Sequence, residues 1–185
     1  MLRPSYPIAT ARLLLRPFRE EDLDDLHAIQ SREDVTRYLY WNPRGRDEIA
    51  EVIKKRAGMA ALVREGDILV LAVELKDAGT VIGDVNLAWH SAEHRQGEFG
   101  FVFHPDHHGR GYAGEAAVEM LRLGFEGLNL HRIIGRADGR NKASARLMEK
   151  LGLRREAHFV QNEIVKGEWT DEVVYAMLAT EWADR

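Results

Sequence analysis

The chain has 185 residues, of which 45% are hydrophobic and 30% are charged, with no cysteine and a formal net charge of −4. These values suit one globular domain over residues 1–185 and exclude an intrinsically disordered chain, a disulfide framework and a cysteine nucleophile. The acidic balance disfavours a nucleic-acid partner, and no apolar run approaches the roughly 20 residues of a membrane helix. We therefore expect a cytoplasmic protein without a nucleic-acid or membrane partner.

The first third of the chain predicts one strand and two helices. The strand covers Arg12–Phe18 and is expected at a sheet edge, because Pro17 cannot donate a hydrogen bond to a neighbour. Acidic residues then open a helix at Glu20, where they oppose the positive end of the helix dipole. A second helix is expected to be capped by Asp47 and to stop at Gly66.

After residue 66 the apolar spacing changes to that of strands. Two helices, Gly111–Leu128 and Asn141–Leu151, interrupt this strand-rich part. The element order is β-α-α-β-β-β-α-β-α-β-β. It predicts an α+β fold with a mixed, mostly antiparallel twisted sheet of about seven strands flanked by helices. The further strands are expected over Ile68–Lys76, Thr80–Trp89, Gly97–Phe103, Arg132–Ala137, Leu153–Val165 and Asp171–Leu178.

A glycine-rich segment joins the aromatic strand to the long helix after it. Gly109, Gly111 and Gly114 lie within His104–Ala117, and without β-carbons they let the backbone turn tightly and approach a ligand closely. The unpaired N–H groups and the positive end of the helix face back toward this loop. A loop that only turns a corner requires fewer glycines, so the segment predicts a phosphate site.

The elements predicted after the loop narrow the kind of phosphate ligand. The spacing Gly109-x-Gly111-x-x-Gly114 matches a dinucleotide fingerprint, with Asp138 near the place of a ribose-binding acid. Only one helix and one hairpin are predicted after Asp138, however, and a dinucleotide-binding unit needs more crossovers. No Gly-Lys-Ser or Gly-Lys-Thr triplet indicates a nucleoside triphosphate loop. A nicotinamide- or flavin-linked enzyme is thus the less favoured alternative.

Two motifs resemble the acyl-CoA segments of the GNAT N-acetyltransferase superfamily. Gly97–Ala116 contains His108-x-x-Gly111-x-Ala113, which is similar to the family pattern Gln/Arg-x-x-Gly-x-Gly/Ala. Asn141–Leu153 resembles the family segment that runs from Asn-x-x-Ser/Ala to Glu-Lys-x-Gly-Phe. The opening Thr10–Phe18 and the closing Val174–Trp182 look like the RimJ/RimL branch, the ribosomal-protein N-terminal acetyltransferases. The resemblance implies the family fold and transfer of an acetyl group from acetyl-CoA to a primary amine in a ternary complex.

The resemblance also places the cosubstrate acetyl-CoA. Its pyrophosphate is expected on the backbone N–H groups of the glycine-rich loop, and its pantetheine beside the aromatic strand, where two strands splay apart. His108 departs from the family's Gln or Arg, but a cradle of backbone groups needs no particular side chain. The expected cofactor-binding residues are Phe101, Val102, Phe103, His108, Gly109, Arg110, Gly111, Tyr112, Ala113, Gly114, Asn141 and Ser144.

Direct transfer from a thioester to an amine needs no covalent enzyme intermediate when both substrates are held together. The resemblance offers Glu98 as acceptor of the amine's proton and Ser144 as donor to the leaving thiolate. Asn141 is a partner of the pantetheine or a helix cap. Glu98 could equally be a polar strand residue facing water. Met148 stands where many family members have a tyrosine, so a non-catalytic acyl-CoA-binding or regulatory module is the alternative to an enzyme.

The sequence indicates less about the amine acceptor and about other partners. We expect a protein N-terminal α-amine or a small-molecule amine, since a shared fold does not separate the two. His104, His107 and His108 complete no recognisable ligand set, so we expect no metal and solvated loop histidines. An edge strand in the C-terminal hairpin could pair across a homodimer. Aromatic residues could line an acceptor groove or simply pack, namely Tyr38, Tyr40, Trp41 and Trp89.

Overall fold

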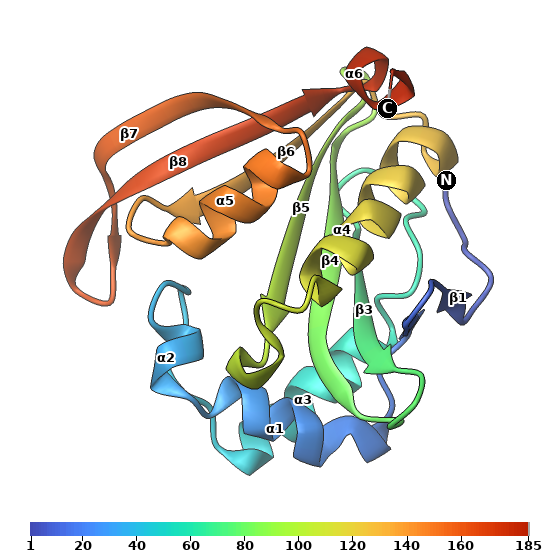
Figure 1. Ribbon diagram of the computed structural model, residues 1–185, viewed down its shortest axis with the longest axis vertical. Helices are drawn as coiled ribbons and strands as arrows, with labels where there is room; N and C mark the ends of the chain where they lie inside the picture. The colour runs from blue at the N-terminus through green and yellow to red at the C-terminus, as the bar shows by residue number, and fades with distance from the viewer. Residues whose placement is uncertain (185) are drawn as a thin grey trace.

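The computed structural model describes residues 1–184, which form one eight-stranded sheet in the order β1-β2-β3-β4-β5-β6-β8-β7 (Figure 1). The strands are β1 (Ile8–Ala9), β2 (Leu13–Arg16), β3 (Ile68–Leu75), β4 (Val81–Ser91), β5 (Gln96–Phe103), β6 (Arg132–Asp138), β7 (Arg154–Val165) and β8 (Glu168–Leu178). The α-helices are α1 (Leu23–Gln30), α2 (Glu33–Thr36), α3 (Arg46–Ala57), α4 (Tyr112–Arg122), α5 (Lys142–Lys150) and α6 (Ala179–Ala183). All neighbouring strands are antiparallel except β5 and β6, which confirms the predicted fold class.

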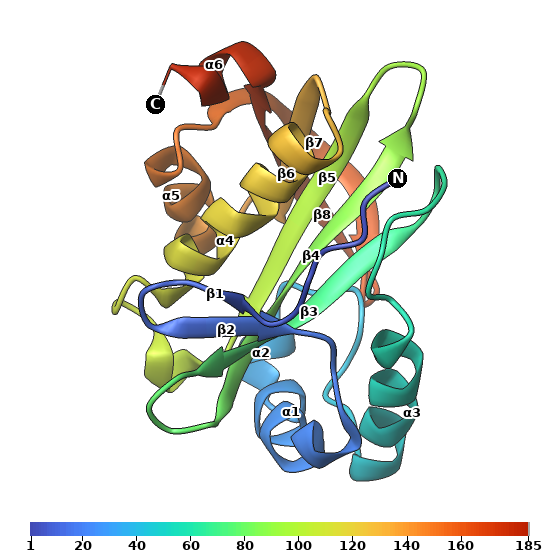
Figure 2. The same cartoon turned by 90° about the vertical axis from the view of Figure 1, so that its right-hand side faces the viewer.

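Helices cover both faces of the sheet, which explains the unbroken apolar run of β3. Leu69, Leu71 and Val73 belong to the core on the side of α4 and α5, whereas Val70 and Ala72 pack with α1 and α3. A strand that is buried on both faces has no reason to alternate between apolar and polar residues. Figure 2 shows the two helical layers on either side of the strands. Within residues 1–184, no helix is both long and apolar enough to cross a membrane.

The structure corrects three expectations at the ends of elements. β2 is not an edge strand, because the two-residue β1 pairs with its outer side. Gly45 rather than Asp47 caps α3, since the Glu48 carboxylate accepts a hydrogen bond of 2.9 Å from Gly45 N. α3 also ends at Ala57, nine residues before the expected end at Gly66. Gly66, with φ of +90°, instead turns the chain toward β3.

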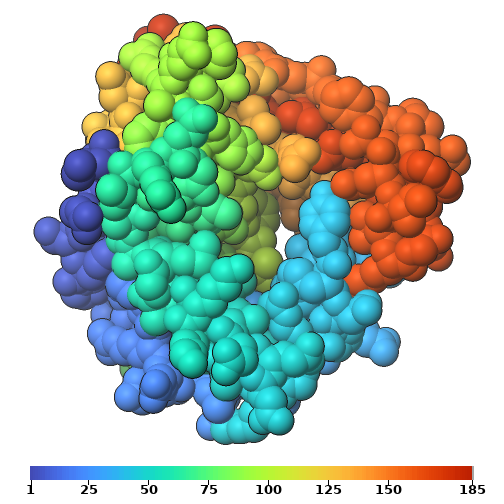
Figure 3. All heavy atoms as spheres, turned by 180° about the vertical axis from the view of Figure 1, so that it is seen from behind, coloured from blue at the N-terminus to red at the C-terminus, as the bar shows by residue number. Residues whose placement is uncertain are grey.

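The parallel pair β5–β6 is short, and its end positions the site. The paired residues are Gln96 with Arg132, Gly97 with Ile133 and Glu98 with Ile134. In the described part of the chain, β5 beyond Glu98 pairs with β4 alone and β6 beyond Ile134 pairs with β8 alone. The two strands therefore separate at this point, and each is followed by an α-helix, β5 by α4 and β6 by α5 (Figure 1). Seen from behind, the surface is hollowed between the green and teal strands on one side and the light blue and orange segments on the other (Figure 3).

Candidate active site

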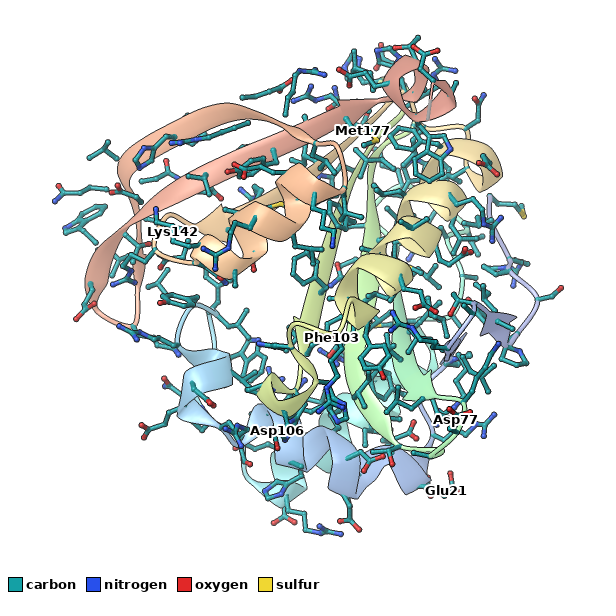
Figure 4. The ribbon with its side chains drawn as sticks, viewed as in Figure 1. Glu21, Asp77, Phe103, Asp106, Lys142 and Met177 are labelled. Carbon is teal, nitrogen blue, oxygen red and sulfur yellow. The ribbon has the colours of Figure 1, made fainter. Side chains whose placement is uncertain are left out.

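A cavity of about 400 Å³ opens where β5 and β6 separate, between the N-terminal turns of α4 and α5. Figure 4 shows this space, with Phe103 at the end of β5 on one side and Lys142 at the start of α5 on the other. Every expected cofactor-binding residue except Arg110 lines it, namely Phe101, Val102, Phe103, His108, Gly109, Gly111, Tyr112, Ala113, Gly114, Asn141 and Ser144. Two distant motifs of the sequence therefore meet in one place.

The glycine-rich loop has the backbone shape of an anion cradle. Gly109 and Gly111 have φ angles of +74° and +83°, a region that favours glycine. Gly111 is the N-cap of α4, whose first N–H groups have no partner within the helix. A β-carbon on Gly109 would meet no heavy atom within 4 Å, so the backbone angle, and not crowding, calls for glycine there. The residues present thus fit a pyrophosphate group of acetyl-CoA.

The side chains around the loop serve to hold its shape. His108 Nε2 lies 3.1 Å from the carbonyl oxygen of Phe103, which ties the loop to the end of β5. Arg110 is exposed and lies outside the cavity wall. Its carbonyl oxygen accepts a hydrogen bond of 2.9 Å from Arg12 Nη1. Arg110 is therefore the one expected cofactor-binding residue that the structure does not bring to the cavity.

Two of the three loop histidines differ from the solvated residues that the sequence predicts, whereas His108 is exposed as expected. His104 and His107 are partly buried, and His107 lines the cavity. Burial, together with the nearby positive charges of His104 and Arg110, lowers the pKa of His107. Among residues 1–184, no group of three or more His, Asp or Glu side chains is placed to hold a metal ion.

The first turn of α5 brings the other polar candidates to the cavity. Asn141 Oδ1 accepts a hydrogen bond of 3.1 Å from Ser144 N, so Asn141 caps α5 while it also lines the cavity. Ser144 is the hydroxyl residue of α5 and lines the same wall. Met148 is buried in the core, where its sulfur would lie 2.6 Å from a β-carbon on Gly135. The residue at the tyrosine position is thus a packing residue, and Ser144 is the proton-donor candidate of this helix.

Sequence patterns did not place α2 and the residues after it at the cavity. With four residues, α2 is too short to show helical periodicity. Contacts with the β7–β8 hairpin fix it instead, since Lys166 Nζ donates to Thr36 O at 2.7 Å and Tyr40 OH donates to Glu163 Oε1 at 2.8 Å. The lining residues that sequence reasoning missed are Asp34, Val35, Leu39, Pro105, His107, Ala143, Leu147 and Lys150.

The aromatic residues considered for an acceptor groove separate into different places. Tyr38 lines the cavity, and Tyr40 is 66% exposed beside the hairpin. The guanidinium carbon of Arg44 lies 4.2 Å from the ring centre of Trp41. Trp89 packs against the main core, on the side of α4.

Glu98 lies on the face of the sheet opposite α4 and α5. Alternation along β5 buries Phe99 in the core beneath these helices and turns Glu98 to the other face. Glu98 Oε2 lies 3.3 Å from Arg136 Nε and 3.7 Å from His90 Nε2, and 24% of the Glu98 side chain is exposed. Glu98 therefore lies where β5 and β6 separate, partly buried and paired with Arg136.

Arg136 links Glu98 to a second carboxylate. Arg136 Nη1 lies 3.0 Å from Glu172 Oε1, and Asn162 Nδ2 donates to Glu172 Oε2 at 3.0 Å. Burial raises the pKa of Glu172, against the opposing effect of Arg136. Glu163 is close enough to raise that pKa further. We call Glu98, Glu163 and Glu172 the carboxylate cluster.

Sequence reasoning missed Arg136 and Glu172, although strand alternation contains a signal for them. Arg136 lies two positions after the residue that pairs with Glu98, and so it shares its face. Glu172 is two positions from Val174, the partner of Arg136 on β8. Finding the pair requires the strand register, which single-strand patterns do not contain.

Comparison with known proteins agrees with this geometry. A family model described as an acetyltransferase (GNAT) domain matches residues 12–154. The uncharacterized N-acetyltransferase YnaD of Bacillus subtilis (strain 168) is 36% identical over 95% of this chain and 98% of its own length. A spermidine N(1)-acetyltransferase of Vibrio cholerae is 27% identical over 95% of this chain and 98% of its own length.

Solved structures show the same architecture. A crystal structure of a GNAT-family acetyltransferase from Bacillus anthracis has a TM-score of 0.84 and 33% identity, covering 94% of this chain and 99% of its own. A spermidine N-acetyltransferase from Vibrio cholerae, solved in complex with CoA and spermine, has a TM-score of 0.77 and 25% identity. That match covers 94% of this chain and 99% of the other.

Proposed function

The chain belongs to the GNAT acetyltransferase family and transfers an acetyl group from acetyl-CoA to an amine, and we propose that the cavity between α4 and α5 is its acetyl-CoA site. The observation that carries this placement is the meeting of three features in one cavity. These are the separated strands β5 and β6, the positive-φ glycines at the start of α4, and the polar first turn of α5. Relatives that are named N-acetyltransferases make this an enzyme rather than a non-catalytic module.

We place the pyrophosphate against the backbone N–H groups of Gly109–Gly114 and the pantetheine beside Phe101–Phe103. Unpaired N–H groups at a helix start stabilise negative oxygens, because the helix dipole adds to their hydrogen bonds. The free edge of β5 beyond Glu98 offers backbone groups to the amides of the pantetheine. This direction brings the thioester toward the point where the two strands part.

In our proposal the amine approaches from the opposite face, beside Glu98. Its nitrogen forms a bond to the carbonyl carbon of the acetyl group, and the carbon–sulfur bond breaks. Glu98 accepts, directly or through a water molecule, the proton that the ammonium group must lose before the attack, and the second proton that the nitrogen releases after the bond forms passes to solvent. Ser144 supplies a proton to the departing thiolate and regains one from solvent. The products are the N-acetylated amine and the free thiol of CoA.

The carboxylate cluster supports a small cationic acceptor over a protein N-terminus of the RimJ/RimL kind. Glu98 and Glu172 share one guanidinium, that of Arg136, and Glu163 adds a third carboxylate beside Glu172, while His90 lies near Glu98 on its other side. A negative excess attracts an acceptor with a second ammonium group, and partial burial protects that attraction from salt. Glu172 is the deepest member, with 4% of the residue exposed. The spermidine acetyltransferases among the relatives support the same choice.

A pair of matched amines tests this acceptor class. We expect 1,4-diaminobutane to react with a kcat/KM per amino group at least about tenfold above 1-aminobutane, because the two differ only in the second amino group and its charge, and tenfold corresponds to about 1.4 kcal/mol. Glu172→Gln should remove most of that difference. The release of CoA thiol measures the rate directly, and the chain itself contributes no thiol because it has no cysteine.

Equal rates for the two amines would contradict a second-charge site. Faster acetylation of a neutral peptide bearing a free N-terminus would favour the RimJ/RimL alternative instead. The variant Glu93→Gln serves as a control, since Glu93 is exposed in the turn between β4 and β5.

We also propose that the protein forms a homodimer. β7 forms the outer edge of the sheet beside β8 and is 12 residues long. A long edge strand with unpaired backbone groups is suited to pairing with a second copy. The cytoplasmic location expected from the sequence stays a prediction.

A further inference from the structure

The start of β2 contacts the glycine-rich loop from outside the cavity. Arg12 Nη1 donates to the carbonyl oxygen of Arg110 at 2.9 Å, and the guanidinium carbon lies 4.5 Å from the ring centre of Tyr112. A β-carbon on Gly111 would lie 3.3 Å from Arg12 Nη2. The guanidinium therefore covers the outer side of the loop, while the inner side lines the cavity.

Glu115, in the first turn of α4, fixes this guanidinium. Its Oε2 accepts a hydrogen bond of 2.8 Å from Arg12 Nε and lies 2.7 Å from Arg12 Nη2. Its Oε1 accepts hydrogen bonds from Arg12 N at 2.8 Å and from Thr10 Oγ1 at 2.6 Å. Burial acts to raise the pKa of Glu115, but the hydrogen bonds from Thr10 and Arg12 outweigh it and lower that pKa. One carboxylate oxygen that contacts two guanidinium nitrogens, and is itself fixed by the bonds to Oε1, holds the planar guanidinium in one orientation.

The fixed guanidinium of Arg12 determines which way one peptide group of the glycine-rich loop points. The carbonyl group of Arg110 and the N–H group of Gly111 belong to the same planar trans peptide and point in opposite directions. Because Arg12 holds the carbonyl oxygen on the outer side, the Gly111 N–H group points to the inner side. A peptide between Gly109 and Gly111 would otherwise rotate with little restraint, since glycine adopts most backbone angles.

We propose that Arg12, held by Glu115, is a positioning residue of the acetyl-CoA site, which fixes the peptide between Arg110 and Gly111 so that its N–H group donates to the pyrophosphate. The inference rests on the proposed placement of acetyl-CoA in this cavity. It assigns a role to the segment Thr10–Arg12, which lies about 100 residues before the loop and which the catalytic scheme does not use.

Calorimetric titration with desulfo-CoA tests this role in the whole protein. We expect Arg12→Gln and Glu115→Gln each to weaken the affinity about tenfold, because each releases the peptide from its fixed direction. Glu115→Gln keeps an oxygen for Thr10 but places an amide beside the guanidinium. Arg122→Gln is the matched control on the same helix. It removes a surface pair with Glu119 far from the loop, and it should change the affinity less than twofold.

A spectroscopic readout separates positioning from general structural loss. In the wild-type protein, the amide proton resonance of Gly111 should move downfield when desulfo-CoA binds, and in Arg12→Gln it should move less than half as far. An affinity in both variants within twofold of wild type, or an unchanged Gly111 response, would overturn the inference. A wild-type protein that does not bind desulfo-CoA would overturn the proposed site itself, and that result needs no variant.

Discussion

Glu98→Gln is expected to lower kcat for amine acetylation by about 100-fold, within the range that a positioned general base contributes. The KM for acetyl-CoA should change little, because Glu98 lies on the face of the sheet opposite the cavity. Initial rates of thiol release at saturating acetyl-CoA and varied amine give kcat, and a series at varied acetyl-CoA gives this KM. Glu93→Gln, in the exposed turn before β5, should keep the wild-type rate.

The loss in Glu98→Gln should be larger at low pH than at high pH. An alkylamine has a pKa near about 10, so nearly all of it is protonated at neutral pH. The wild-type enzyme removes that proton through Glu98. The variant depends instead on the small unprotonated fraction of the amine, which falls tenfold for each unit by which the pH is lowered. Rates between pH 6 and 9 check this. Parallel pH–rate profiles in the two proteins would remove Glu98 from the mechanism.

Gly114→Val is expected to weaken acetyl-CoA binding at least about 100-fold, which corresponds to about 2.7 kcal/mol. Gly114 lies in the first turn of α4, and a β-carbon there would be 3.6 Å from Leu147 Cδ1 on α5. The two further methyl groups of valine extend into the space between the helices, where we place the cosubstrate. The fold should tolerate the change, because valine suits a helix interior at least as well as glycine.

The control for Gly114→Val is Gly58→Val at the end of α3. Gly58 is exposed, has right-handed backbone angles, and its β-carbon would meet nothing closer than Lys55 O at 3.7 Å. This variant should bind acetyl-CoA as wild type does in calorimetry. Unchanged affinity in Gly114→Val, with normal thermal unfolding, would place the cosubstrate outside this cavity.

Features that depend on local spacing were predictable from the sequence. The positive-φ glycines at 109 and 111, the buried face of α4 and the Asn141 cap all depend on residues a few positions apart. The same holds for the pairing of neighbouring strands that short turns join, such as β3 and β4. Local patterns thus place most of the donor cavity.

Features that depend on register or on distant contacts were not predictable in this way. α2 reaches the cavity because Lys166 of the hairpin holds its last residue and Glu163 holds Tyr40 after it, and neither hairpin residue is near α2 in the chain. β1 is two residues long, too short to show a period, so β2 was wrongly expected at the edge. The Arg136–Glu172 pair needs the register between β6 and β8, which only the folded sheet supplies.

Thermal unfolding in the presence of acetyl-CoA, desulfo-CoA and NAD tests the acetyl-CoA site most directly. A ligand at about one hundred times its dissociation constant adds about 2.7 kcal/mol of stability, which raises the melting temperature of a domain this size by about 5–10 °C. We predict this rise with both CoA compounds and none with NAD. Stabilisation by NAD alone, or by none of the three, would contradict the assignment of the glycine-rich loop to acetyl-CoA.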